Sequence, residues 1–274
     1  MHNFSSGEKR NYYGKADVIV YRLHRDGAPP PVFGAAVTML LYGDAFWPTY
    51  SSGDNTNLVA TDSMKNFIQR EALNFEGADL EGFVRFLAEK FLRIYPQTEG
   101  IQVSATGIPY AAIAGGNMAY APSGPDRAMA SIELRQVGET VELRSGIHGF
   151  KLLRLGGSAF TGFVRDEYTT LPEVTNRPLH MWLDLEWTCS PPAVLAASVR
   201  RLVHQVFQEF ESGSIQQVIY RIGARMLAEL PEVAEVRLEA NNRTWDTTAE
   251  RDGTLGIFTD PRPPYGVLGL TLKR

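Results

Sequence analysis

Hydrophobic positions alternate with polar ones in several stretches of the chain, and in other stretches they recur every three or four residues. Alternation is typical of β-strands and the longer period of amphipathic helices. In the first half the strand-like stretches are residues 16–24, 33–44, 100–107 and 128–137. Between the second and third of these, the pattern predicts one helix capped by Asp62 or Ser63 and another over residues 79–95.

The second half of the chain shows the same order of elements. Its strand-like stretches are residues 139–155, 179–188, 235–239 and 266–272. Two helical stretches, residues 192–210 and 214–229, lie between the second and third of them. Strand, strand, helix, helix, strand, strand therefore occurs twice.

A short alignment supports an internal duplication. Residues 91–103 superpose without gaps on residues 226–238, with Pro96 on Pro231, an offset of 135 residues. A helix, a proline and a strand recur by chance, so this match alone is weak. Agreement between two whole halves is harder to dismiss.

The repeated order predicts an α+β fold of two tandem halves, residues 1–137 and 138–274. In each half, two helices would cover one face of an antiparallel four-stranded sheet. The other face and the edges would stay open, and open edges favour pairing with another copy. We therefore expect a closed homo-oligomer in which the sheets join into a β-barrel.

Composition narrows the choice of partners and compartment. A net charge of −4 and a pI near 5.8 argue against a nucleic-acid surface, because such surfaces offer many cations to phosphate groups. The one cysteine, Cys189, excludes an intrachain disulfide and fits a reducing compartment. No apolar run is long enough to span a bilayer, and the first residues lack the apolar core of a signal peptide. We expect a cytoplasmic protein that binds neither nucleic acid nor membrane.

Metal-binding motifs are not indicated. The sequence holds no HxH, HExxH or CxxC spacing, so we predict no metal site.

Residues 158–178 combine an aromatic side chain, Phe160, with the cations Arg165 and Arg177 between two strand-like stretches. An aromatic face beside a forked donor suits a flat, polar, anionic heterocycle. The same residues also fit a surface loop in which Phe160 fills a gap in the core. On their chemistry alone the two interpretations are equally good.

Three segments resemble the urate oxidases, or uricases: GFVRDEYTTLPE (162–173), YGKADVIVYR (13–22) and VATDSMKN (59–66). The resemblance covers nearly the whole chain. It implies the tunnelling fold (T-fold), in which tandem halves assemble into a barrel with active sites between subunits. The expected assembly is a homo-oligomer, with a homotetramer preferred over a dimer.

The resemblance also implies a set of site residues. The catalytic pair would be Lys15 and Thr61. The substrate-binding residues would be Asp62, Phe160 as stacking platform, Arg177 as cation, Ile215 through its backbone N–H, Gln216 and Asn242. Each has an ordinary alternative: a solvated lysine, residues capping a helix, an exposed glutamine, an asparagine in a turn.

The implied reaction is oxidation of urate by dioxygen to 5-hydroxyisourate and hydrogen peroxide without a cofactor. Urate is a planar anion that can stack on an aromatic ring while directional donors grip its edge. An electron-rich urate dianion can reduce dioxygen itself, so the protein has to supply a base. The resemblance implies that Lys15 is this base and that the Thr61 hydroxyl passes the proton on.

One position departs from the family. Where uricases have a histidine that completes the relay, this chain has Thr244, which cannot carry a proton as imidazole does. Three alternatives stay open. The protein is a uricase that runs on Lys15 and Thr61, an oxidase of another purine or heteroaromatic ring, or an inactive purine-binding or structural protein.

Overall fold

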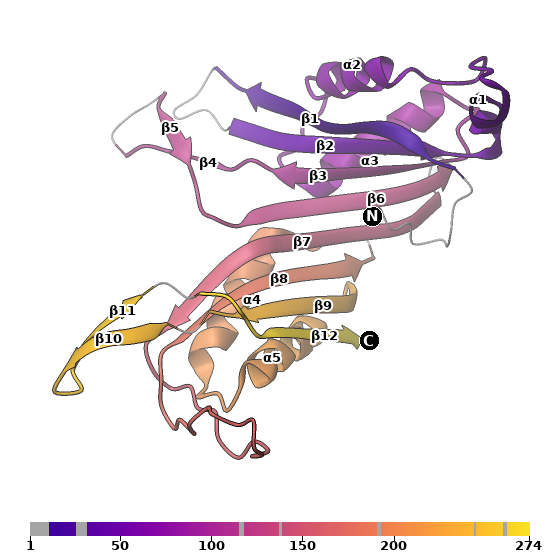
Figure 1. The fold of residues 1–274 in the computed structure, drawn as a ribbon. Coiled ribbons are helices and arrows are strands. Elements are labelled where there is room, and N and C mark those ends of the chain that lie inside the picture. The colour runs from indigo at the N-terminus through magenta and orange to yellow at the C-terminus, as the bar shows by residue number, and fades with distance from the viewer. Residues whose placement is uncertain are drawn as a thin grey trace. The chain divides into compact units, whose positions relative to one another are not determined.

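The computed structural model describes residues 11–25, 32–114, 118–136, 139–190, 193–243, 245–259 and 262–274 (Figure 1). The chain divides into two compact units. The first consists of Met1–Gly146 with Thr188–Leu195, and the second of Ile147–Trp187 with Ala196–Arg274.

Four long strands of the first unit lie side by side in the order in which they occur along the chain. They are β1 (Tyr13–Leu23), β2 (Val32–Tyr42), β3 (Gly100–Gly107) and β6 (Arg127–Gln136), neighbours in that order and antiparallel. Helix α2 (Thr61–Glu71) contacts β1, and α3 (Leu80–Ile94) contacts β3 and β6. Alternate strand residues and the helical stripe of α3, with Phe83 and Phe91 at its centre, form the buried core of this unit.

The second unit repeats this plan. Its strands are β7 (Glu139–Arg154, in this unit from Ile147), β8 (Leu179–Cys189), β9 (Val233–Asn242) and β12 (Val267–Lys273), neighbours in that order. Helices α4 (Ala196–Glu209) and α5 (Ile215–Glu229) contact each other, and α5 packs on β9 and β12 (Figure 1). Gly223 permits this close approach, because a Cβ there would lie 2.9 Å from Leu272 Cδ1 and 3.0 Å from Leu238 Cδ1.

Helices α3 and α5 correspond residue by residue. Both contain 15 residues, and they begin at Leu80 and Ile215. The side chains of Asp79 and Ser214 cap them by accepting hydrogen bonds from backbone N–H groups three residues ahead. These positions differ by 135, the same offset that aligns Pro96 with Pro231.

The structure confirms the eight long strands and four helices predicted from periodicity, and their ends differ from the predictions by a few residues. The predicted cap of α2 is wrong. The helix begins at Thr61, its N-cap is Ala60, and no side chain caps it. The Asp62 side chain instead bonds forward to Lys65 and Asn66 inside the helix.

Several short elements have no counterpart in the predictions. They are η1 (Asp44–Phe46), α1 (Trp47–Ser52), the hairpin β4 (Tyr110–Ala112) with β5 (Tyr120–Pro122), and the hairpin β10 (Asp246–Arg251) with β11 (Leu255–Thr259). No helix in the described part of the chain combines the length and the apolar character needed to cross a membrane.

Candidate functional site

The loop between β7 and β8 folds back on itself and brings its aromatic and cationic residues together. The N–H of Phe160 donates to the Val174 carbonyl at 2.7 Å, and the N–H of Val174 donates to the Phe160 carbonyl at 3.1 Å. The N–H of Arg177 donates to the Ser158 carbonyl at 2.9 Å. Phe160 and Arg177 are therefore held on two adjoining backbone segments.

The side chains of Phe160 and Arg177 lie beside each other. The guanidinium carbon of Arg177 lies 5.9 Å from the centre of the Phe160 ring, which stacks on Phe163 at 5.0 Å and an interplanar angle of 15°. Burial lowers the pKa of Arg177 below its usual value, yet a guanidinium remains a cation at neutral pH. Its Nε is buried and has no hydrogen-bond partner in the described part of the chain. A buried donor of this kind calls for a partner from outside the chain, a ligand or a water.

The N-terminus of α5 is attached to the same loop. The N–H of Ala159 donates to the Ser212 carbonyl at 2.7 Å, and the N–H of Ser212 donates to the Gly157 carbonyl at 2.9 Å. Ser212 stands two residues before Ser214, the N-cap of α5. Ile215 and Gln216 thus begin a helix whose first backbone N–H groups have no acceptor within the helix. Gln216 is exposed and the side chain of Ile215 is buried.

Asn242 and its neighbours lie at the end of β9. The N–H of Asn242 donates to the Gly266 carbonyl at 2.9 Å, and the N–H of Arg243 donates to the His180 carbonyl at 3.0 Å. The His180 ring lies 5.3 Å from the ring of Trp245. Thr244 is outside the described residues, but the residues on both sides of it contact His180.

Arg243, next to Thr244 in the sequence, packs its side chain against aromatic rings. Its guanidinium carbon lies 4.0 Å from the centre of the Trp182 ring and 3.4 Å from that of Tyr265. The cation is therefore occupied by two aromatic rings.

In the first unit, β1, which carries Lys15, packs against α2, which begins at Thr61. Lys15 is half-buried on β1, opposite Met39, directly before an irregularity in the pairing with β2. Asp62 accepts hydrogen bonds from Lys65 Nζ at 2.5 Å and Asn66 Nδ2 at 3.0 Å. The bond to Lys65 lowers the pKa of Asp62 most, and the charge of Lys15 adds a smaller effect. Lys15 therefore lies within electrostatic reach of the helix end that Thr61 begins.

Comparison with known proteins identifies the family. The sequence model of the Uricase family matches residues 143–266. The uricase of Haloferax volcanii is 37% identical to the chain over 96% of the chain and 97% of its own length. The chain belongs to the uricase family.

Other members agree with this assignment. The "Uric acid degradation bifunctional protein PucL" of Bacillus subtilis is 38% identical over 96% of the chain, and the chain spans 60% of the length of that protein. The crystal structure of a uricase from Bacillus fastidious superposes with a TM-score of 0.86 at 35% identity, covering 97% of this chain and 94% of that one. The predicted resemblance to uricases and the α+β fold are confirmed.

The predicted site residues other than Asn242, which ends β9, fall into two groups, one in each unit. Phe160, Arg177 and the first turn of α5 form the first group, which we call the clamp. Lys15, Thr61 and Asp62 form the second group.

Two residues that organise these groups were missed by sequence reasoning. Ser212 connects the loop to α5, and the only signal for it is its place in a Ser-Gly-Ser run before a helix. Tyr13 accepts a hydrogen bond from the Val59 N–H at 3.0 Å, which holds the segment leading to Thr61 against β1. Tyr13 belongs to the segment YGKADVIVYR, where Lys15 alone was singled out.

The polar face of the second unit's sheet is a separate feature. A hollow of about 490 Å³ is lined by His148, Asp184, Glu186, Arg237, Leu238, Glu239, Gly269, Leu270 and Thr271. His148 Nε2 lies 3.0 Å from Glu186 Oε1, and this hydrogen bond raises the pKa of His148. None of these residues belongs to the clamp.

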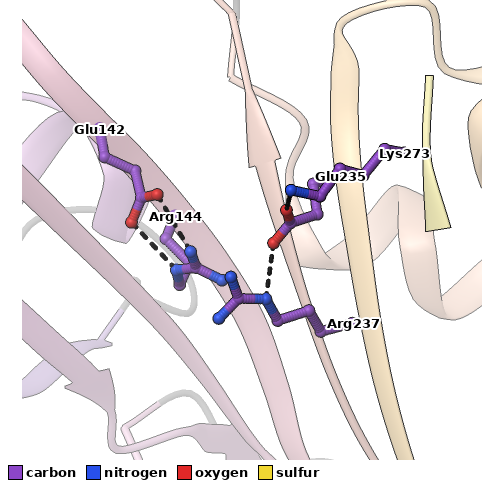
Figure 2. Close-up of polar contacts among 5 residues, drawn as sticks. All are labelled: Glu142, Arg144, Glu235, Arg237 and Lys273. Carbon is purple, nitrogen blue, oxygen red and sulfur yellow. Dashed lines mark hydrogen bonds and ion pairs between the residues drawn. The ribbon is translucent and has the colours of Figure 1, made fainter. Parts of the chain in front are cut away.

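Ion pairs also lie on β9 and β12 of this sheet (Figure 2). On β9 and β12, Glu235 pairs with Arg237 at 2.6 Å and with Lys273 at 2.9 Å. Opposed charges on neighbouring positions keep this sheet surface hydrophilic. A further pair, Glu142 with Arg144 at 3.0 Å, lies on the part of β7 that belongs to the first unit.

Replacing Tyr13 by Phe tests the link between β1 and α2. Loss of the acceptor for Val59 N–H should lower the free energy of unfolding by about 1 kcal/mol at pH 7. Burial raises the pKa of Tyr13 to about 12 in the folded protein, above the usual value of 10.0. The contribution of the neutral Tyr13 side chain to the free energy of unfolding is therefore complete below pH 10 and is lost as the pH rises through about 12. Urea unfolding from pH 7 to 12 should show a gap between the two proteins that shrinks at alkaline pH; a constant gap would contradict this assignment.

Proposed function

We propose that this protein oxidises urate with dioxygen and water to 5-hydroxyisourate and hydrogen peroxide, without a metal or an organic cofactor. The observation that carries the proposal is the clamp. A half-buried guanidinium, whose Nε has no hydrogen-bond partner in the described part of the chain, stands beside an aromatic ring and a helix N-terminus, on residues whose spacing resembles that of uricases.

The clamp suits a flat monoanion. The urate ring would stack on Phe160, and Arg177 would donate two parallel hydrogen bonds to its carbonyl and ring-nitrogen edge. The backbone N–H of Ile215 and the side-chain amide of Gln216 would bind the opposite edge. The partial positive charge at the start of α5 favours the anion as well.

The chemistry needs a base and a path for oxygen. Lys15 would take a proton from urate through the Thr61 hydroxyl, which donates and accepts at once. Two electrons then pass from the ring to dioxygen, which leaves as hydrogen peroxide with two protons, and water adds to the oxidised ring. Asn242 would hold the dioxygen or the water. Atoms balance, since urate, dioxygen and water give 5-hydroxyisourate and peroxide.

We also propose that the clamp and the base meet between copies of the chain. The tandem halves, residues 1–137 and 138–274, would assemble into a barrel as a homotetramer. Edge strand β1 supports this, since it exposes apolar side chains: Ile19 is 53% exposed, Tyr21 50% and Leu23 58%. Cys189, a buried free thiol, fits the reducing cytoplasm.

Lys15→Met should abolish turnover and leave urate binding intact, because methionine keeps the length of the side chain and removes the base. Loss of urate absorbance together with peroxide release measures turnover, and the rate should fall at least ~100-fold. Lys65→Met is the matched control, since it removes a lysine that pairs with Asp62 inside α2 and leaves Lys15 in place. Full activity in Lys15→Met would remove Lys15 from the mechanism. If the wild-type protein binds urate without consuming it, the alternative of an inactive purine-binding protein is favoured. If it does not bind urate, the alternative of an oxidase that acts on another ring is favoured.

Thr244→His tests whether the absent imidazole limits the reaction. If Lys15 and Thr61 carry the proton alone, the substitution should preserve or raise the rate of urate oxidation, because imidazole adds a second proton carrier. A large loss of rate at unchanged urate affinity would show that the pocket has been rebuilt around threonine. The pH dependence of kcat in both proteins measures the difference.

Mixing two inactive variants tests the shared site. Lys15→Met lacks the base and Arg177→Gln lacks the cation of the clamp. If one copy supplies each group, random mixing of the two chains should restore about a quarter of the sites. Co-expression and purification through two different tags gives the mixed oligomer. No recovery in a mixed oligomer would mean that base and clamp come from one chain.

A further inference from the structure

Arg154, the last residue of β7, reaches the turn between α4 and α5. Its Nη1 donates to the carbonyls of Phe207 at 3.0 Å and Phe210 at 2.6 Å, and its Nη2 donates to Ser212 Oγ at 2.6 Å. The guanidinium carbon also lies 5.2 Å from the centre of the Phe207 ring. One side chain therefore satisfies the last carbonyls around α4 and holds a hydroxyl in the following turn.

The hydroxyl that Arg154 holds belongs to the residue that joins the two parts of the clamp. Ser212 is 2% exposed, and its backbone bonds to Gly157 and Ala159 on the segment that leads to Phe160. Two residues later the chain enters α5, which carries Gln216. The Ser212 hydroxyl also lies 3.4 Å from Ser158 Oγ. The position of Ser212 therefore sets the spacing between the stacking ring and the helix start.

The first unit contains the equivalent arginine without the third contact. Arg22, near the end of β1, donates to the carbonyls of Phe75 and Gly77 in the turn between α2 and α3. Its guanidinium carbon lies 5.0 Å from the centre of the Phe33 ring and 5.4 Å from that of Phe75. Both arginines thus tie a first strand to a turn between helices, but only in the second unit does the arginine also hold the residue that bridges to a ligand-binding loop.

We propose that Arg154 is a positioning residue for urate affinity, acting through Ser212 on the distance between Phe160 and Gln216. This inference rests on the proposed function. Arg154 is not assigned any contact with urate or with the reacting atoms. Because binding groups must be held within a fraction of an ångström of their productive places, a looser Ser212 weakens the grip on both edges of the ring. Lys15 and Thr61 are in the other unit, so the base itself is unaffected.

The test compares Arg154→Gln with Arg22→Gln. Each substitution removes an arginine that donates hydrogen bonds to a turn between two helices, so the two variants are matched. Urate binding is measured without oxygen, so that the Kd is separate from turnover, and thermal unfolding is measured at one protein concentration. Both variants should lose thermal stability. Arg154→Gln should raise the Kd about tenfold or more, whereas Arg22→Gln should change it less than about twofold. Equal effects on the Kd would mean that Arg154 is a structural residue only.

Ser212→Ala keeps the test decisive if Arg154→Gln fails to fold. Alanine preserves the backbone bridge and removes only the hydroxyl that Arg154 holds, so the Kd should rise while kcat changes little. In the double variant, the Kd should rise by less than the product of the two single fold-changes, because both substitutions remove the same contact between Arg154 and Ser212. An unchanged Kd in Ser212→Ala would overturn the inference. A wild-type protein that binds no urate would instead overturn the proposed function and this inference with it, which distinguishes the two failures.

Discussion

The backbone bridge between Ser158 and Ser212 is the contact on which the candidate site depends. The chain between β7 and β8 contains no regular element, and loops of this length keep one shape only when tied down. Two hydrogen bonds to Ser212, two between Phe160 and Val174, and one from Arg177 to Ser158 tie it at three places. Each such bond stabilises the fold by only about 1 kcal/mol, so the bonds matter chiefly because they fix the positions of the residues they join. They place an aromatic ring, a cation and a helix N-terminus at one end of the second unit.

The two halves of the chain use one plan for different purposes. In both, a sheet is covered by two helices, an arginine from the first strand grips the turn between them, and a capped helix of 15 residues follows. The first half presents Lys15 beside the start of its first long helix, near Asp62. The second half presents the clamp beside the start of its second long helix, α5. The two units thus differ at their loops and helix ends, where a change of side chain disturbs the core least.

Much of this fold could be predicted from the sequence, because burial on one face imposes a period on each long strand and helix. Strand β8 shows the rule, with Leu179, Met181, Leu183, Leu185 and Trp187 all buried at alternate positions. The short hairpins were missed because exposed strands of three to six residues carry no such period. The cap of α2 was mispredicted because Asp62 finds its partners inside the helix, at Lys65 and Asn66.

For the site, resemblance and geometry contributed different parts. Phe160 and Arg177 were predicted from a motif that keeps their spacing, and the structure places them together. Arg154 and Ser212 could not be predicted, since their contact joins residues 58 positions apart and neither belongs to a motif. The contacts of His180 with Arg243 and Trp245, on either side of Thr244, could not be predicted either, because they join segments far apart in the sequence.

The most direct test of this account is a crystal structure of the protein with urate, grown and frozen without oxygen. We expect the ring stacked on Phe160, with Arg177 and Gln216 bonded to opposite edges and Lys15 and Thr61 of a second copy within hydrogen-bond reach. Urate bound elsewhere, or a clamp far from Lys15 and Thr61 of every neighbouring copy, would contradict the account.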